Sequence, residues 1–99
     1  MTYDQRRRWI LDWLLKQKPC RCDTLDALFS DTYIETTKAT FQMRAYGAHV
    51  CPALARDLAR MAKEGSLVRH RRGIAGFAGQ GFPKWVWVYE LAPHLKEAA

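Results

Sequence analysis

The stretch "VCPALARDLARMAKEG", residues 50–65, constrains the fold more than any other part of this chain of 99 residues. Pro52 stands where the first turn of a helix tolerates proline, and Gly65 stands where helices commonly end. At about 100° per residue, one side of this helix collects Leu54, Leu58, Met61 and Ala62, and the opposite side collects Arg56, Arg60 and Lys63. The stretch therefore predicts an amphipathic helix over residues 51–64 whose apolar side packs on other elements.

Two segments after this helix have the composition of β-strands. The first is "LVRHR", and the second is "KWVWVYEL", which is rich in Val, Trp and Tyr. Between them, "RGIAGFAGQGFP" holds four of the six glycines, which indicates a long hairpin loop rather than a tight turn. A two-stranded hairpin is only marginally stable alone in water, so its apolar side must pack on the helices. We expect a hairpin over residues 67–91 and a short tail over residues 92–99.

The first half of the chain predicts shorter helices. Residues 4–16 have helical spacing of apolar side chains, and residues 23–29 give a second short helix with an Asp or Cys cap. A third helix is expected over residues 37–46, where apolar residues recur at helical spacing and a glycine follows. We therefore expect a single α+β, mostly helical domain over residues 1–99, with three to four helices followed by a C-terminal β-hairpin.

Charge and cysteine content limit the partners and the compartment. Sixteen Lys and Arg against ten Asp and Glu give a formal net charge of +6, which favours polyanionic partners such as nucleic acid or an anionic membrane surface. Three arginines at residues 6–8 precede an apolar run, but Asp12 interrupts it and no cleavage site follows, so we expect no signal peptide. No apolar window is long enough for a membrane span. Three cysteines without an export signal indicate reduced thiols and a cytoplasmic setting.

A helix ending in "LARMAKEGSLVR", followed by a glycine-rich hairpin that closes on "VYEL", resembles the winged helix-turn-helix DNA-binding domains of small bacterial and phage-type transcriptional regulators. The residues that carry the resemblance are Leu58, Met61, Glu64, Gly65, Leu67, Val68, Arg69, Val88, Tyr89 and Leu91. The resemblance implies that residues 51–64 form the reader helix and that the hairpin of residues 67–91 is the wing. The segment from Ser30 to Val50 is longer than the usual tight turn, so either helix 23–29 or helix 37–46 would pack behind the reader.

The basic side of the reader helix continues into the hairpin, and this continuation favours a nucleic-acid partner over a merely solvated helix face. A DNA duplex carries one phosphate charge per roughly 1.7 Å of axis, which suits a linear row of cations. We expect the outward side of the first helical turns to contact base edges, with Arg56 as the first candidate because arginine pairs bidentately with guanine. That group comprises Ala53, Arg56, Asp57 and Arg60. The residues expected to contact phosphate or lie beside it are Lys63, Arg69, His70, Arg71, Arg72 and Lys84.

The function expected on these grounds is sequence-specific binding of double-stranded DNA, in transcriptional regulation or in phage or plasmid control. Two alternatives remain open, because winged helices also serve as protein–protein interaction adaptors and as RNA-binding modules. Four tryptophans, Trp9, Trp13, Trp85 and Trp87, are more than a small domain can easily bury. They leave open a homodimer contact or another protein partner.

Metal and catalytic chemistry find little support. Cys20 and Cys22, with His49 and Cys51, could suggest four zinc ligands, but a gap of one residue strains both members of a pair onto one metal. We expect no metal and no cofactor. The three histidines do not fall in a triad-like pattern, and the chain lacks GxxxxGK[ST], HExxH and a dinucleotide fingerprint. We therefore expect that the protein is not an enzyme.

Overall fold

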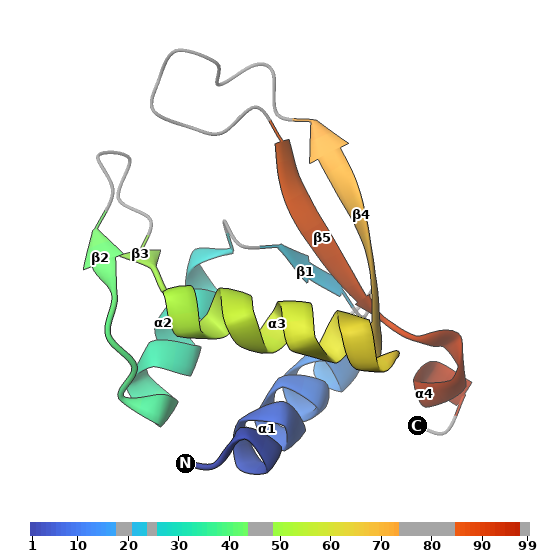
Figure 1. Ribbon diagram of the computed structural model, residues 1–99, viewed down its shortest axis with the longest axis horizontal. Coiled ribbons are helices and arrows are strands. Elements are labelled where there is room, and N and C mark those ends of the chain that lie inside the picture. The colour runs from blue at the N-terminus through green and yellow to red at the C-terminus, as the bar shows by residue number, and fades with distance from the viewer. Residues whose placement is uncertain (18–20, 24–25, 44–48, 74–84, 98–99) are drawn as a thin grey trace.

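The computed structural model describes residues 1–17, 21–23, 26–43, 49–73 and 85–97. The described ranges form a small α+β domain (Figure 1). Its helices are α1 (Tyr3–Lys16), α2 (Ala27–Thr37), α3 (Pro52–Glu64) and α4 (Pro93–Glu97). Its strands are β1 (Arg21–Asp23), β2 (Gln42–Met43), β3 (His49–Val50), β4 (Leu67–Gly73) and β5 (Trp85–Leu91). None of the helices in these ranges combines the length and the apolar character that a bilayer crossing needs.

The main sheet has three antiparallel strands in the order β1-β5-β4, so that β5 lies in the middle. Leu67 pairs with Leu91 at one end of the β4–β5 hairpin, and Gly73 pairs with Trp85 at the other. The predicted hairpin is thus confirmed, whereas β1 was not expected from the sequence. A separate two-stranded ladder joins β2 to β3.

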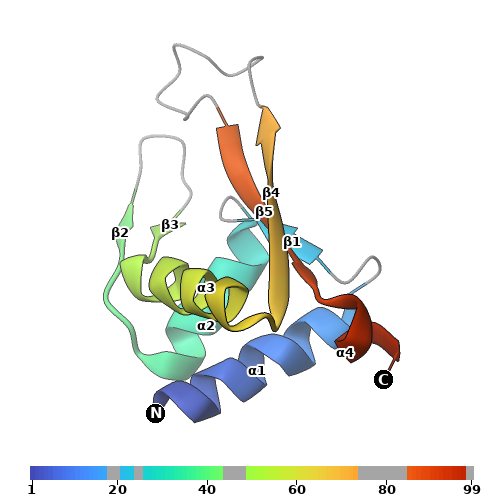
Figure 2. The ribbon, with the colours of Figure 1, turned by 45° about the vertical axis from the view of Figure 1, so that its right-hand side comes forward.

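Helix α3 lies between the two pairs of strands. Figure 1 shows the β2–β3 ladder near its N-terminal end and the β4–β5 hairpin at its C-terminal end. The hairpin leaves the helices and extends away from them, and the turned view in Figure 2 shows the same arrangement. In both views α1 lies on the opposite side of α3 from the far end of the hairpin. One side of α3 therefore faces α1, and the hairpin rises from the other.

The core is shared by three helices and the base of the sheet. Its largest fully buried side chains are Ile10, Leu14, Phe29, Tyr33, Leu58, Met61, Leu67 and Leu91. Beside them, Trp9 stacks on Trp13 and on Phe29, with ring centroids 5.5 and 6.0 Å apart. Aromatic pairs at such distances add stability beyond the area they bury. This cluster fixes α2 against α1, and the apolar side of α3 covers it.

Helix ends explain where the sequence predictions held and where they failed. As predicted, Pro52 opens α3 and Gly65 closes it, in the left-handed conformation at φ 91°. Helix α2 runs to Thr37, well beyond the predicted residues 23–29, because Asp26 caps it and the buried Phe29 and Tyr33 extend it. The predicted helix over residues 37–46 is wrong: Lys38 takes φ 60°, which ends α2, and β2 follows. Of the two helices expected to pack behind residues 51–64, the structure has α2, whose Tyr33 hydroxyl donates to Asp57 of α3.

Candidate nucleic-acid interface

The outward side of α3 carries two exposed cations, Arg56 and Lys63. They lie almost opposite the buried Leu54 and Leu58 on the helix. A shallow groove of about 600 Å³ continues from this side to β4. It is lined by Ala59, Ala62, Lys63, Leu67, Val68 and Arg69. The small side chains Ala59 and Ala62 of α3 therefore leave open space between the basic side of the helix and the start of β4.

On the hairpin, Arg69 and Arg71 share one sheet face with Trp85 and Trp87, since the register pairs Arg71 with Trp87. The Arg69 guanidinium lies 4.2 Å from the ring centroid of Trp87. The Arg71 guanidinium lies 4.7 Å from the ring of Trp85 and 5.5 Å from that of Trp87. The two rings meet edge to face at 5.1 Å. Cation–π attraction thus holds both arginines beside the tryptophan rings on this face.

Two cations of α3 and two of β4 together form what we call the basic track: Arg56, Lys63, Arg69 and Arg71. All four are exposed. Within the described ranges, no carboxylate forms an ion pair with any of them. Cations without carboxylate partners keep their attraction for an external polyanion, so this surface can attract phosphate.

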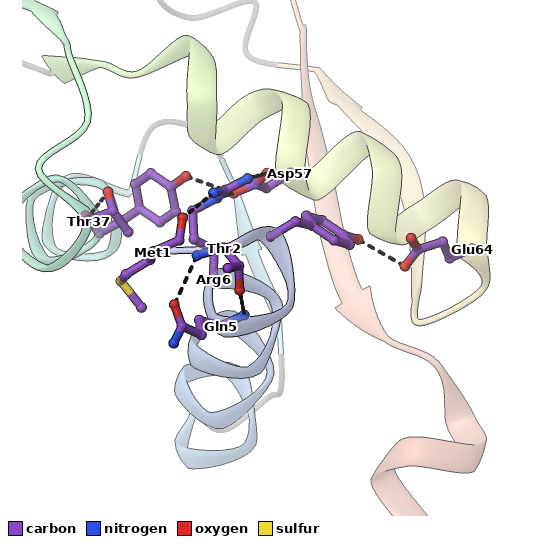
Figure 3. Close-up of polar contacts among 9 residues, drawn as sticks. Met1, Thr2, Gln5, Arg6, Thr37, Asp57 and Glu64 are labelled. Atoms are coloured by element: carbon purple, nitrogen blue, oxygen red, sulfur yellow. Dashed lines mark hydrogen bonds and ion pairs between the residues drawn. The ribbon is translucent and has the colours of Figure 1, made fainter.

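The placement of Asp57 corrects the sequence prediction that it contacts DNA. Asp57 is buried, with an exposed fraction of 5%, and faces α1 and α2 (Figure 3). Arg6 donates to its carboxylate from Nε at 2.8 Å and from Nη2 at 3.3 Å, and the Tyr33 hydroxyl donates at 2.8 Å. The hydrogen bond from Arg6 to Asp57 raises the pKa of Arg6 above its usual value. Burial, with the bond to Asp57, raises the pKa of Tyr33.

Arg60 turns toward α1, away from the line of the basic track. Its guanidinium lies 3.6 Å from the ring centroid of Tyr3, and its Nε is 3.3 Å from Glu64 Oε1. The Tyr3 hydroxyl donates to Glu64 Oε2 at 2.9 Å. A dashed line at Glu64 marks this contact in Figure 3. Burial and this hydrogen bond raise the pKa of Tyr3 to about 12. Arg60 remains exposed, but it is already engaged by an aromatic ring and a carboxylate.

The remaining predicted contact residues fall in different places. Ala53 is half-buried and packs on the core, so it offers little surface to a ligand. His70 and Arg72 are exposed on the sheet face opposite Arg69 and Arg71. There Arg72 forms an ion pair and a hydrogen bond with Asp23 of β1. Lys84 lies outside the described residues.

The cysteines do not support a metal centre in the part of the chain that the structure describes. Cys22 and Cys51 are both buried free thiols. Burial raises the pKa of Cys22 to about 12, which keeps it protonated and makes it a poor metal ligand. Cys20 and the side chain of His49 lie outside the described residues. Among the residues that are described, no group of three or more His, Cys, Asp or Glu side chains could hold a metal ion.

Sequence reasoning missed the contacts that orient α3. The sequence shows Arg6 and Arg7 only as part of a basic cluster, yet Arg6 pairs with Asp57, and Arg7 donates to the Ser66 hydroxyl at 2.7 Å. One signal was available: Asp57 lies three residues after Leu54 and four before Met61, which places it on the apolar side of the helix.

Compared with protein-family models, curated proteins and solved structures, the chain matches none of them.

Proposed function

We propose that the chain is a winged helix-turn-helix protein that binds double-stranded DNA, with α3 in the major groove and the β4–β5 hairpin on the phosphate backbone. The fold part of the proposal is supported by the sheet order β1-β5-β4 and by the position of the hairpin directly after α3. The β2–β3 ladder replaces the usual short turn between α2 and α3. Occupancy of a site would be the means of transcriptional control.

The basic track carries the functional part of the proposal. Its four cations run from the exposed side of α3, across the groove beside Lys63, to one face of the hairpin. The described carboxylates leave them unpaired, while Arg6, Arg60 and Arg72 are engaged within the domain. Arg56 is the best-placed candidate for a base contact, because it lies within the first turns of α3 and points outward. Lys63, Arg69 and Arg71 are assigned to phosphates.

A protein-interaction adaptor fits the described surface less well. A common mark of such a contact site is a continuous exposed apolar patch. The large exposed apolar side chains of the described ranges lie instead on several different elements: Met1, Leu15, Leu28, Phe41, Val68 and Trp85. The apolar residues nearest the basic track, Val68 and Trp85, are flanked by arginines. Such a mixed surface suits a nucleic acid better than an apolar protein partner.

The test measures binding of fluorescently labelled random duplex DNA, single-stranded DNA and RNA by polarisation over a series of salt concentrations. We expect duplex binding whose log affinity falls linearly with log salt concentration, with a slope of about −0.9 per phosphate contacted. Arg71→Gln should reduce this slope by about one unit. Arg56→Gln should lower affinity by roughly 1–3 kcal/mol for the preferred sequence and relax the preference.

Two matched controls remove a positive charge outside the basic track. Arg72→Gln changes the neighbour of Arg71 on the other sheet face, and Arg8→Gln changes an exposed arginine of α1. Both should leave the salt slope near that of the wild type. Duplex affinity that is independent of salt, or tighter binding of RNA than of duplex DNA, would overturn the proposal. Equal losses of duplex affinity in Arg71→Gln and Arg72→Gln would show that net charge, and not the assigned surface, determines binding, which would also count against the proposal.

A further inference from the structure

Two tryptophans on β5 lie directly beneath the arginines of the hairpin part of the basic track. Trp85 has an exposed fraction of 40%, although a large apolar ring gains most when it is buried. Trp87 is half-buried at the edge of the core. The ring of Trp87 lies near both Arg69 and Arg71, and the ring of Trp85 lies near Arg71. The rings therefore do more here than fill the core.

We infer that Trp85 and Trp87 are positioning residues that hold the Arg69 and Arg71 guanidinium groups in line, so that they bind neighbouring phosphates of one DNA strand. This inference rests on the proposed function. Residues two apart on a strand are about 7 Å apart, which is comparable to the distance between adjacent phosphates of one strand. A free arginine side chain loses roughly 2 kcal/mol of rotamer entropy when it is fixed. Arginines that are already held on the rings lose less of it when DNA binds.

The same geometry argues against base stacking as the role of these rings. One face of Trp87 carries Arg69, and the edge contact between Trp85 and Trp87 takes up a further side. The Arg71 guanidinium lies within 5.5 Å of both rings. A nucleobase would have to displace these arginines from the rings. The sheet register, which places the four side chains on one face, instead presents the cations outward.

The first test examines the free protein by NMR. Side-chain protons of Arg69 and Arg71 should resonate upfield of an unstructured arginine, because they lie over aromatic rings. Trp85→Leu should return the Arg71 signals toward the unstructured position and leave those of Arg69 in place. Arg56, which has no aromatic ring within the described contacts, is the internal control. Ordinary shifts for Arg69 and Arg71 in the wild type would overturn the inference without any reference to DNA.

The second test is a double-mutant cycle on duplex affinity. If an exposed cation–π contact fixes each arginine before DNA binds, its loss in Trp85→Leu or Trp87→Leu should weaken the affinity for duplex DNA by about two- to fivefold. In an Arg69→Gln, Arg71→Gln background, the same tryptophan changes should have no further effect, whereas Arg56→Gln should still weaken binding. Trp85→Leu is the safer variant, because Trp85 is more exposed than Trp87 and its loss spares the core.

The outcomes separate the inference from the function on which it rests. Tryptophan changes that weaken binding equally in both backgrounds would mean that the rings act on DNA directly, which overturns the positioning role. Tryptophan changes without effect in either background overturn it as well. A wild-type chain that fails to bind duplex DNA overturns the proposed function and the phosphate role together. Thermal unfolding of each variant checks that a loss of affinity is not a loss of fold.

Discussion

Asp57→Ala is the change from which we expect the largest effect on stability. The carboxylate is buried and accepts hydrogen bonds from Arg6 and from Tyr33. Its loss leaves a guanidinium and a phenol hydroxyl without their partner, and neither group can turn fully into water. Breaking a buried ion pair by removing one partner costs about 3–5 kcal/mol.

The structure sets the expected loss toward the lower end of that range. The Arg6 side chain is 27% exposed, so water restores part of its hydration when Asp57 is gone. The Tyr33 hydroxyl is buried, and its lost bond to a charged acceptor costs about 1.5–3 kcal/mol. We therefore expect the free energy of unfolding to fall by about 3 kcal/mol, against a total of about 5–15 kcal/mol for a domain. The midpoint of thermal unfolding should fall by about 12–24 °C.

The assay is urea unfolding followed by circular dichroism at 25 °C, with a thermal scan beside it. Tyr33→Phe removes one hydrogen bond and leaves the Arg6 pair intact, so it should cost less than Asp57→Ala. Arg56→Ala, next to Asp57 but exposed, is the matched control and should change stability by less than about 0.5 kcal/mol. If Asp57→Ala costs no more than this control, Asp57 is not the buried acceptor described above and the reasoning is refuted.

Two further predictions concern pH and backbone conformation. The pKa of Tyr3 is about 12 in the folded protein, whereas the pKa of an unfolded tyrosine is about 10. The folded state therefore holds this proton to higher pH, so stability should fall as pH rises from about 10 to about 12, with a shallower fall in Tyr3→Phe. Urea unfolding at several pH values between about 10 and 12 measures how the free energy of unfolding of each protein changes with pH. Equal slopes for the wild type and Tyr3→Phe would contradict the raised pKa of Tyr3. Gly65→Ala should lower the free energy of unfolding by about 1 kcal/mol, because Gly65 has φ 91°, a conformation that strains a residue with a Cβ. An added Cβ meets nothing within 4 Å, so no steric clash adds to this cost. Gly73→Ala, which is also uncrowded but lacks a positive φ, is the thermal-unfolding control and should stay within about 0.5 kcal/mol of wild type.

Elements with strong local signals could be predicted from the sequence. Helix α3 has a proline at its start, a glycine at its end and two clear faces, and its bounds came out as expected. The β4–β5 hairpin was similarly clear, because its strands are rich in β-forming residues and a glycine-rich stretch separates them. In both cases the information lies within a few residues of each element.

Elements that depend on distant partners could not be predicted. Strand β1 has three residues and exists through its pairing with β5, so its own composition says little. Apolar spacing over residues 37–46 suggested a helix, but the left-handed conformation of Lys38 ends α2 there. Helix α2 contains three threonines, which favour helices weakly, and is stabilised by the burial of Phe29 and Tyr33. Tertiary packing outweighs propensity in each of these segments.

In the candidate site, too, the exposed cations could be predicted from the sequence, whereas the contacts of the α1 arginines with α3 could not. Both acidic residues of α3, Asp57 and Glu64, turn toward α1. There Arg6 pairs with Asp57, and Arg7 lies 3.5 Å from Glu64, whose carboxylate also accepts from Tyr3. Within the described residues, the negative charges of α3 are thus held against α1 and kept off its outward side. Arg6 and Arg7, whose charges oppose the dipole of their own helix, thus pair with the acidic side chains of α3 and leave cations as the charged groups on its outward side.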